Sequence, residues 1–213
     1  VRPPNFMGAS KRFSELILLY YSKFKTNVSK KTNFSSVRFG NVIGSSGSVI
    51  PLFEKQIQRG GPLTITDKLA TRFFMSINEA AELVIQASAI SEGGDIFVLD
   101  MGKPVSIDYI AKKMIDFSNL RLVEKKSKQD EIEIVYTGLS KGEKLNEELF
   151  IDNKQVKTIH PKIFKASKML NDNYFNSFEE DLNKLLKFIN DDNIEQTIKI
   201  LSKWVEGFSQ IKK

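Results

Sequence analysis

The sequence predicts an α/β fold. Short apolar runs with strand character alternate with stretches in which apolar residues recur every three or four positions. Glycines separate these segments at Gly40, at Gly60-Gly61 and at Gly93-Gly94. The 213 residues are 41% hydrophobic and include 16 Phe, so the chain can bury a substantial core.

Periodicity and capping residues define the expected elements. Helices are expected over 9–25, 49–59, 79–89 and 107–117, with Ser48, Asn78 and Ser106 as N-caps, followed by two helices after residue 173. Strands are expected over 34–39, 63–66, 71–77, 95–99 and 132–136. A further short helix is expected to begin at Lys144.

Composition excludes several classes of function. The chain has no Cys and one His, His160, so disulfides, a cysteine nucleophile and a multi-histidine metal site are excluded, and no metal is expected. No apolar run approaches the ~20 residues of a spanning helix, and we expect no membrane contact from these residues. The net charge of +6 comes from dispersed lysines. We expect a solvated surface and no nucleic-acid partner.

The chain reads as a piece of a longer protein. It begins with Val and not Met, and its first helix follows a Pro-Pro segment directly. No glycine-rich dinucleotide turn follows an apolar strand and opens a helix. We therefore expect the half that binds the dinucleotide to be missing, and no turnover from this chain alone.

Three long runs resemble one known family. They are RFGNVIGSSGSVIPLFEKQIQRGGPLTITDKLATRFFMSINEAAELVIQA, GGDIFVLDMGKPVSIDYIAKKMI and IVYTGLSKGEKLNEELF. They are similar to the CapD-like polysaccharide-biosynthesis proteins, which are nucleotide-sugar 4,6-dehydratases of the extended short-chain dehydrogenase superfamily. The resemblance implies that residues 1–170 are the C-terminal part of a Rossmann-like catalytic domain with a nucleotide-sugar-binding subdomain. Residues 171–213 would then form a helical tail.

The N-terminal run NFMGASKRFSE resembles the helix in which that superfamily places a Tyr four residues before a Lys. Lys11 stands in the lysine position and Met7 in the tyrosine position, and the resemblance implies that both are catalytic-site residues. Lys11 would contact the nicotinamide ribose of NAD or NADP. Because a thioether cannot transfer a proton, the proton role must pass to residues before Val1, and Met7 would pack against the ligand. Met in place of Tyr resembles a membrane-anchored branch of the family.

The remaining site residues follow from the same resemblance. It implies cofactor contacts from Gly40, Asn41 and Val42, and substrate contacts from Asn41, Ser48, Val49, Ile50, Pro51, Arg72 and Glu143. Arg72 would bind the diphosphate, because a guanidinium matches two phosphate oxygens. Glu143 would accept ribose hydroxyls, although Ser140 and Lys141 stand where the family usually has Arg and Pro. His160 is expected to be structural.

The resemblance implies a reaction on a UDP-sugar, typically UDP-N-acetylglucosamine. A hydride leaves sugar C4 for NAD or NADP, water is eliminated across C5 and C6, and the hydride returns to C6. Two alternatives stay open, an epimerase of the same superfamily and a non-catalytic nucleotide-sugar-binding or assembly domain. A homo-oligomer in bacterial surface glycan synthesis is expected. Its location would be the cytoplasm, or the cytoplasmic face of the inner membrane if transmembrane helices precede it.

Overall fold

The computed structural model describes residues 3, 5–24, 32–147, 155–166 and 172–208. The chain divides into two compact units. The first, here called the α1 unit, contains the described residues up to 38, residues 85–99 and the described residues after 149. The second, here called the α5 unit, contains 39–84 and the described residues from 100 to 147. Each unit is therefore assembled from separate stretches of sequence.

A four-stranded sheet organises the α1 unit. Its order is β1-β6-β12-β11, formed by β1 (Ser35–Arg38), β6 (Asp95–Leu99), β12 (Ile163–Ala166) and β11 (Gln155–Lys157). β1 runs parallel to β6, with Val37 opposite Phe97, and β12 runs antiparallel to both β6 and β11. One of the four boundaries between the two units along the chain falls within α4 (Ile77–Ala89).

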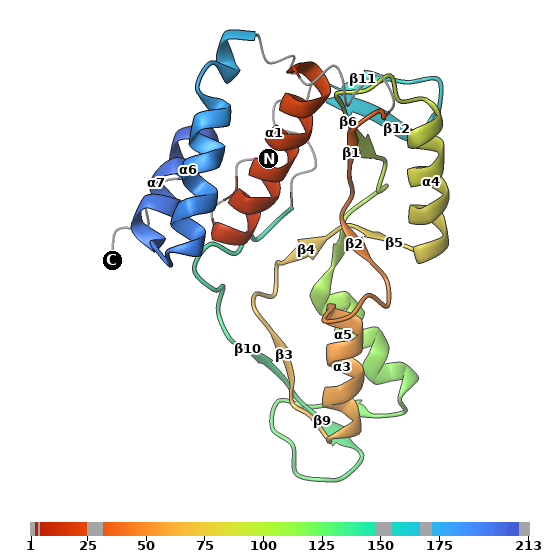
Figure 1. Cartoon of the computed structure of the whole chain (residues 1–213). Helices are drawn as coiled ribbons and strands as arrows, with labels where there is room; N and C mark the ends of the chain where they lie inside the picture. Colours follow the sequence, from red (N-terminus) through yellow and green to blue (C-terminus); the bar gives the residue numbers. More distant parts are fainter. Residues whose placement is uncertain (1–2, 4, 25–31, 148–154, 167–171, 209–213) are drawn as a thin grey trace. The chain divides into compact units, whose positions relative to one another are not determined.

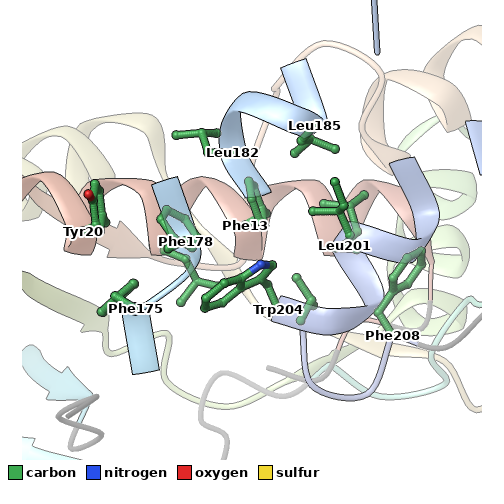
Figure 2. Close-up of a cluster of buried hydrophobic side chains, with 13 residues drawn as sticks. Phe13, Tyr20, Phe175, Phe178, Leu182, Leu185, Leu201, Trp204 and Phe208 are labelled. Atoms are coloured by element: carbon green, nitrogen blue, oxygen red, sulfur yellow. The ribbon is translucent and has the colours of Figure 1, made fainter. Parts of the chain in front are cut away.

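Helix α1 (Phe6–Phe24) packs against the two terminal helices, α6 (Phe178–Asn190) and α7 (Ile194–Trp204), as Figure 1 shows in red and blue. Apolar positions recur every three or four residues along all three helices, which gives each one an apolar face. These faces and the short 3-10 helix η1 (Asp172–Phe175) enclose the cluster of Figure 2. Its buried members are Ala9, Phe13, Leu16, Tyr20, Phe175, Phe178, Leu182, Leu185, Ile200, Leu201, Trp204, Val205 and Phe208. The predicted tail is thus part of the core of this unit.

The α5 unit has its own core between two helices and a parallel strand pair. The helices are α3 (Val49–Gln58) and α5 (Ile107–Phe117), and β3 (Leu63–Ile65) pairs with β10 (Ile134–Tyr136). The core contains Phe53, Leu63, Ile65, Ala70, Ile107, Ala111, Ile115 and Ile132, all buried. The observed alternation of helices and strands confirms the predicted α/β class.

Short strand pairs complete the α5 unit. β2 (Asn41–Val42) runs parallel to β5 (Phe74–Met75), and β4 (Thr71–Arg72) runs antiparallel to β7 (Val105–Ser106). β8 (Arg121–Leu122) runs parallel to β9 (Glu131–Ile132). No helix in the described ranges is long and apolar enough to cross a membrane.

Several expectations about local structure need correction. The expected strand over 71–77 is two short strands with different partners, and the expected strand over 132–136 is likewise divided between β9 and β10. Asn78 is not a cap, because α4 begins before it and the Ser76 hydroxyl accepts the Glu79 N–H at 3.1 Å. The helix expected from Lys144 is wrong for residues 144–147, which are not helical; the rest of that expectation lies outside the described residues.

Candidate functional site

Helix α1 exposes the two residues expected to meet the cofactor. Met7, Lys11 and Ser14 lie three and four positions apart, so they share one face of the helix. All three are exposed, and Met7 is 63% exposed. The opposite face carries Ala9 and Phe13, which are buried in the cluster of Figure 2. None of the ion pairs within the described residues involves Lys11, which lies on this exposed face.

A half-buried ion pair lies on the flank of α1. Glu15 binds the Arg38 guanidinium through both carboxylate oxygens, at 2.5 Å to Nε and 2.6 Å to Nη2. Arg12 adds a contact from Nη1 to Glu15 at 2.6 Å. Burial alone would raise the pKa of Glu15, but the hydrogen bonds and charges of Arg38 and then Arg12 outweigh it and hold the pKa below the usual carboxyl value. Glu15 is therefore ionised at neutral pH.

The segment after β1 enters the α5 unit with close packing. The Asn41 N–H donates to the Phe73 carbonyl at 2.9 Å, and Asn41 lies opposite Phe74 in the β2–β5 pair, with Val42 next to it. A Cβ at Gly40 would lie 3.0 Å from Phe73 Cβ and 3.1 Å from the Phe73 carbonyl oxygen. A side chain at position 40 would force Phe73 to shift by a few tenths of an ångström, so close packing favours glycine there independently of any ligand.

Ser48 is the N-cap residue of α3 and follows a loop with two left-handed glycines. Gly44 and Gly47 have φ values of 78° and 74°, which favour glycine. The Ser48 side chain makes no capping hydrogen bond, and its buried hydroxyl oxygen has no hydrogen-bond partner among the residues that the structure describes. A buried hydroxyl without a partner costs about 1–3 kcal/mol. This hydroxyl is therefore suited to a polar ligand.

The first turn of α3 contains the other predicted pocket residues. Val49, Ile50 and Pro51 are all partly buried, and Val49 packs against the core of the α5 unit. Proline is tolerated here because the N–H groups of a first helical turn have no partner within the helix. These three apolar side chains follow Ser48 directly in the sequence.

Arg72 lies in β4 with most of its guanidinium engaged. Nη1 donates to the carbonyls of Thr71 at 2.8 Å and Leu145 at 2.9 Å. The Nε–Nη2 edge faces two carboxylates, with Nη2 at 3.1 Å from Glu143 and Nε at 3.8 Å from Glu147. This edge is the one that could donate two hydrogen bonds to the oxygens of a single anion.

Glu143 is held from three directions. Its Oε1 accepts the Thr66 hydroxyl at 2.8 Å as well as Arg72, and its Oε2 accepts the Ser140 N–H at 3.2 Å. The Glu143 N–H in turn donates to the Ser140 carbonyl at 2.9 Å. Ser140, which replaces the usual Arg of the resembled family, thus fixes the turn that carries Glu143. Oε2 keeps capacity for a further donor.

The structure brings together two of the predicted substrate residues, Arg72 and Glu143, which are 71 positions apart in sequence. Lys11 and Met7 belong to the α1 unit, and the other predicted site residues belong to the α5 unit. Sequence reasoning missed Thr66 and Glu147 as partners of these groups. An acidic residue four positions after Glu143 was the available signal for Glu147, and no local pattern indicated Thr66.

His160, the single histidine of the chain, lies between β11 and β12. The described residues contain no group of three or more His, Asp or Glu side chains suited to a metal ion. His160 Nδ1 accepts the Lys162 N–H at 3.2 Å in the turn between β11 and β12, which supports the structural role expected for it.

Comparisons with known proteins show the family to which the chain belongs. The family described as polysaccharide biosynthesis protein matches residues 1–168. The capsular polysaccharide biosynthesis protein CapD of Staphylococcus aureus is 42% identical over 200 residues, which are 89% of this chain and 31% of CapD. A UDP-glucose 4-epimerase of Rickettsia bellii is 44% identical over 115 residues, which are 54% of this chain and 33% of that enzyme.

The fold has a solved counterpart. The X-ray structure of Pen from Bacillus thuringiensis superposes with a TM-score of 0.68 and 35% identity, covering 80% of this chain and 50% of Pen. The chain spans about a third of the length of the two curated relatives and half of Pen. Its architecture is that of the Rossmann-type extended short-chain dehydrogenases. The chain belongs to the polysaccharide biosynthesis protein family of this superfamily.

Proposed function

We propose that the protein containing this chain is a nucleotide-sugar 4,6-dehydratase that acts on a UDP-N-acetylhexosamine and that this chain supplies most of the sugar-nucleotide pocket. The observation that carries the proposal is the Arg72–Glu143 contact. A guanidinium for a diphosphate and a carboxylate for ribose hydroxyls are held 3.1 Å apart by residues from β4 and from the turn at 140–143. Diphosphate and ribose are also adjacent groups in every UDP-sugar.

The Nε–Nη2 edge of Arg72 has suitable chemistry for the diphosphate. Both Nη1 protons are held by main-chain carbonyls, which fixes the plane of the guanidinium before a ligand arrives. Preorganised donors reduce the entropy lost on binding. Because Glu143 and Glu147 face the Nε–Nη2 edge in this structure, a diphosphate would displace one of them from Arg72. The hydroxyls of the ribose could then donate hydrogen bonds to the Glu143 carboxylate.

The buried Ser48 hydroxyl supports a polar group of the substrate at the start of α3. The first N–H groups of a helix point outward without internal partners, and the helix dipole favours negative charge there. Val49, Ile50 and Pro51 would supply the apolar wall against which a nucleobase packs. Asn41 would orient the sugar or the diphosphate with one donor and one acceptor.

The cofactor proposed for the intact protein is NAD or NADP, which accepts and returns the hydride of the reaction. Lys11 fits such a group because it is an exposed cation on the open face of α1, without an ion-pair partner in the described ranges. Its ammonium would donate to ribose hydroxyls and favour anionic states nearby. Met7, on the same face, can pack against a flat ring but cannot move a proton.

Calorimetric titration of the intact protein with UDP tests the diphosphate assignment. Arg72→Ala should weaken UDP and UDP-N-acetylglucosamine by similar factors, roughly ten- to a hundredfold, because a charge-assisted contact is worth about 1.5–3 kcal/mol. Arg72→Lys should restore only part of the affinity, since an ammonium lacks the planar fork. Arg121→Ala is the matched control, because Arg121 also pairs with a glutamate of the α5 unit. Unchanged UDP affinity in Arg72→Ala would remove Arg72 from the site.

Product analysis tests the reaction. The intact protein should convert UDP-N-acetylglucosamine to a 4-keto-6-deoxy sugar nucleotide. The relative named UDP-glucose 4-epimerase supports a second candidate, because epimerisation also begins with oxidation at C4. A product that keeps its C6 hydroxyl and is inverted at one carbon would identify the epimerase. Nucleotide-sugar binding without any product, in the presence of NAD or NADP, would instead identify a binding or assembly domain.

A further inference from the structure

Helix α1 is held in two physically different ways. On the side opposite Lys11, aromatic and aliphatic side chains pack against α6 and α7 (Figure 2). Apolar packing of this kind is strong but has little directional preference. On the flank, the Glu15 carboxylate makes directional hydrogen bonds to a strand residue, Arg38. The two sets of contacts therefore restrict different motions of the helix.

The Glu15–Arg38 contact has the geometry of a fixed joint. Two parallel N–H···O bonds, at 2.5 and 2.6 Å, align the carboxylate with the guanidinium plane. The side chains of Glu15 and Arg38 are only 16% and 13% exposed, so water competes weakly for these bonds. Arg12, three positions earlier on the helix, binds the same carboxylate at 2.6 Å. Rotation or sliding of α1 along β1 would break these bonds.

Lys11 and Glu15 lie one helical turn apart, which connects the joint to the proposed cofactor contact. Residues at i and i+4 are neighbours along a helix, so a displacement of Glu15 carries the Lys11 backbone with it. Arg38 is the last residue of β1, a strand held along its length by β6. The Glu15–Arg38 contact thus fixes the position of α1 relative to the sheet of the same unit.

We propose that Glu15 is a positioning residue for Lys11: through Arg38 it fixes the rotation and axial position of α1, and with them the place of the Lys11 ammonium. The inference rests on the proposed function in one respect, that Lys11 contacts the nicotinamide ribose. Glu15 itself need not touch cofactor or substrate. Its effect on catalysis would arise entirely from where it holds the helix.

A double-mutant cycle on cofactor affinity in the intact protein tests the proposal. The cycle compares Glu15→Gln, Lys11→Ala and the double variant by calorimetric titration with NAD+ or NADP+, whichever the protein binds. Glu15→Gln should weaken binding roughly tenfold, because misplacing a binding group by ~1 Å can cost up to ~100-fold in a reaction that depends on it. In the Lys11→Ala background the same substitution should change affinity less than twofold, since its target is gone.

Two further variants separate positioning from general loss of structure. Arg38→Lys keeps a positive charge but loses the fork, so its affinity should lie between wild type and Glu15→Gln. Asp181 lies on α6, in the same unit, and is not part of the Glu15–Arg38 contact. Its carboxylate accepts the Trp204 Nε1–H at 2.9 Å, and Asp181→Asn removes that carboxylate. It should lower thermal stability without changing cofactor affinity. Amide hydrogen exchange within α1, measured without cofactor, should rise in Glu15→Gln and Arg38→Lys by more than it rises in Asp181→Asn for an equal loss of thermal stability.

Each outcome has a separate meaning. If Glu15→Gln weakens binding equally with and without Lys11, the effect is not transmitted through Lys11 and the positioning role is refuted. Wild-type affinity in both Glu15→Gln and Arg38→Lys would refute it as well. If Lys11→Ala leaves cofactor affinity unchanged, the proposed function of Lys11 fails, whatever the behaviour of Glu15.

Discussion

Phe178 is the side chain whose removal should most weaken the α1 unit. It is fully buried, and its ring lies 4.8 Å from Trp204, 5.2 Å from Tyr20, and 5.4 Å from both Phe13 and Phe175, measured between ring centroids (Figure 2). Phe178→Ala removes all four ring contacts and leaves a cavity that helices from three parts of the sequence cannot easily close. Such substitutions lower the free energy of unfolding by about 3–5 kcal/mol, and we expect about 4 kcal/mol here.

Urea unfolding followed by tryptophan fluorescence measures this loss directly. Trp204 is the single Trp of the chain and lies next to Phe178, so its emission reports on this cluster. With a denaturant slope near ~2 kcal/mol/M, the midpoint should fall by about 2 M. Phe178→Leu should cost less than Phe178→Ala, because Leu refills part of the volume of the ring. The control is Leu186→Ala on the same helix. The Leu186 side chain is half exposed. Because substitutions at surface sites change the free energy of unfolding by roughly ±0.5 kcal/mol, this one should cost less than about 1 kcal/mol. Equal midpoints for Phe178→Ala and Leu186→Ala would refute the assignment of this cluster as the core of the unit.

Two other predictions concern carboxylates of the α5 unit. Glu143→Gln should lower the affinity for UDP but raise the affinity for pyrophosphate a few-fold, because it removes both the ribose acceptor and a negative charge beside Arg72. Calorimetry with both ligands checks this. An equal loss of affinity for both ligands would contradict the ribose role. Hydrogen bonds from the Ser127 hydroxyl and N–H, with others from the Lys128 N–H and Arg121, lower the pKa of Glu131 to about 2 despite its burial. Because the folded-state pKa is below the unfolded value, Glu131 stabilises the fold above about pH 4.5. The stability difference between wild type and Glu131→Gln should therefore shrink as pH falls from 4.5 toward 2 in urea titrations; a pH-independent difference would contradict the argument.

Local sequence signals predicted elements whose stability is local. The helix over 107–117 and its Ser106 cap are confirmed, with the Ser106 hydroxyl accepting the Tyr109 N–H, and the strand over 95–99 is confirmed at both ends. The expected single strands over 71–77 and 132–136 are wrong because each apolar run changes partner midway. Strands β11 and β12 were not predicted, and the place of β12 in the sheet depends on β6, which is more than 60 residues away in sequence. Pairing over such distances leaves no periodic trace in a single sequence.

The candidate site shows the same division. A family resemblance singled out Arg72 and Glu143 as substrate residues, and the structure adds that they bind each other. The contact between Glu15 and Arg38 was not predicted. Both pairs depend on tertiary packing, which a helical or strand period cannot reveal. The functional roles of all the site residues stay predictions: Met7, Lys11, Gly40, Asn41, Val42, Ser48, Val49, Ile50, Pro51, Arg72 and Glu143.

The pairing of α1 with α6 and α7 constrains the order of events during synthesis. Phe13 and Tyr20 leave the ribosome first, and Phe178 and Trp204, which cover them, follow some 160–190 residues later. At 5–20 residues per second, the apolar face of α1 must wait roughly 10–40 s for its partners. During that interval it presents Phe13, Leu16 and Tyr20 to solvent or to chaperones. The sheet has a similar delay, because β6 receives β12 only after residue 166 has emerged. Folding of the α1 unit is therefore completed after translation of its last helix, and a nascent chain that stalls before α6 should be a chaperone substrate.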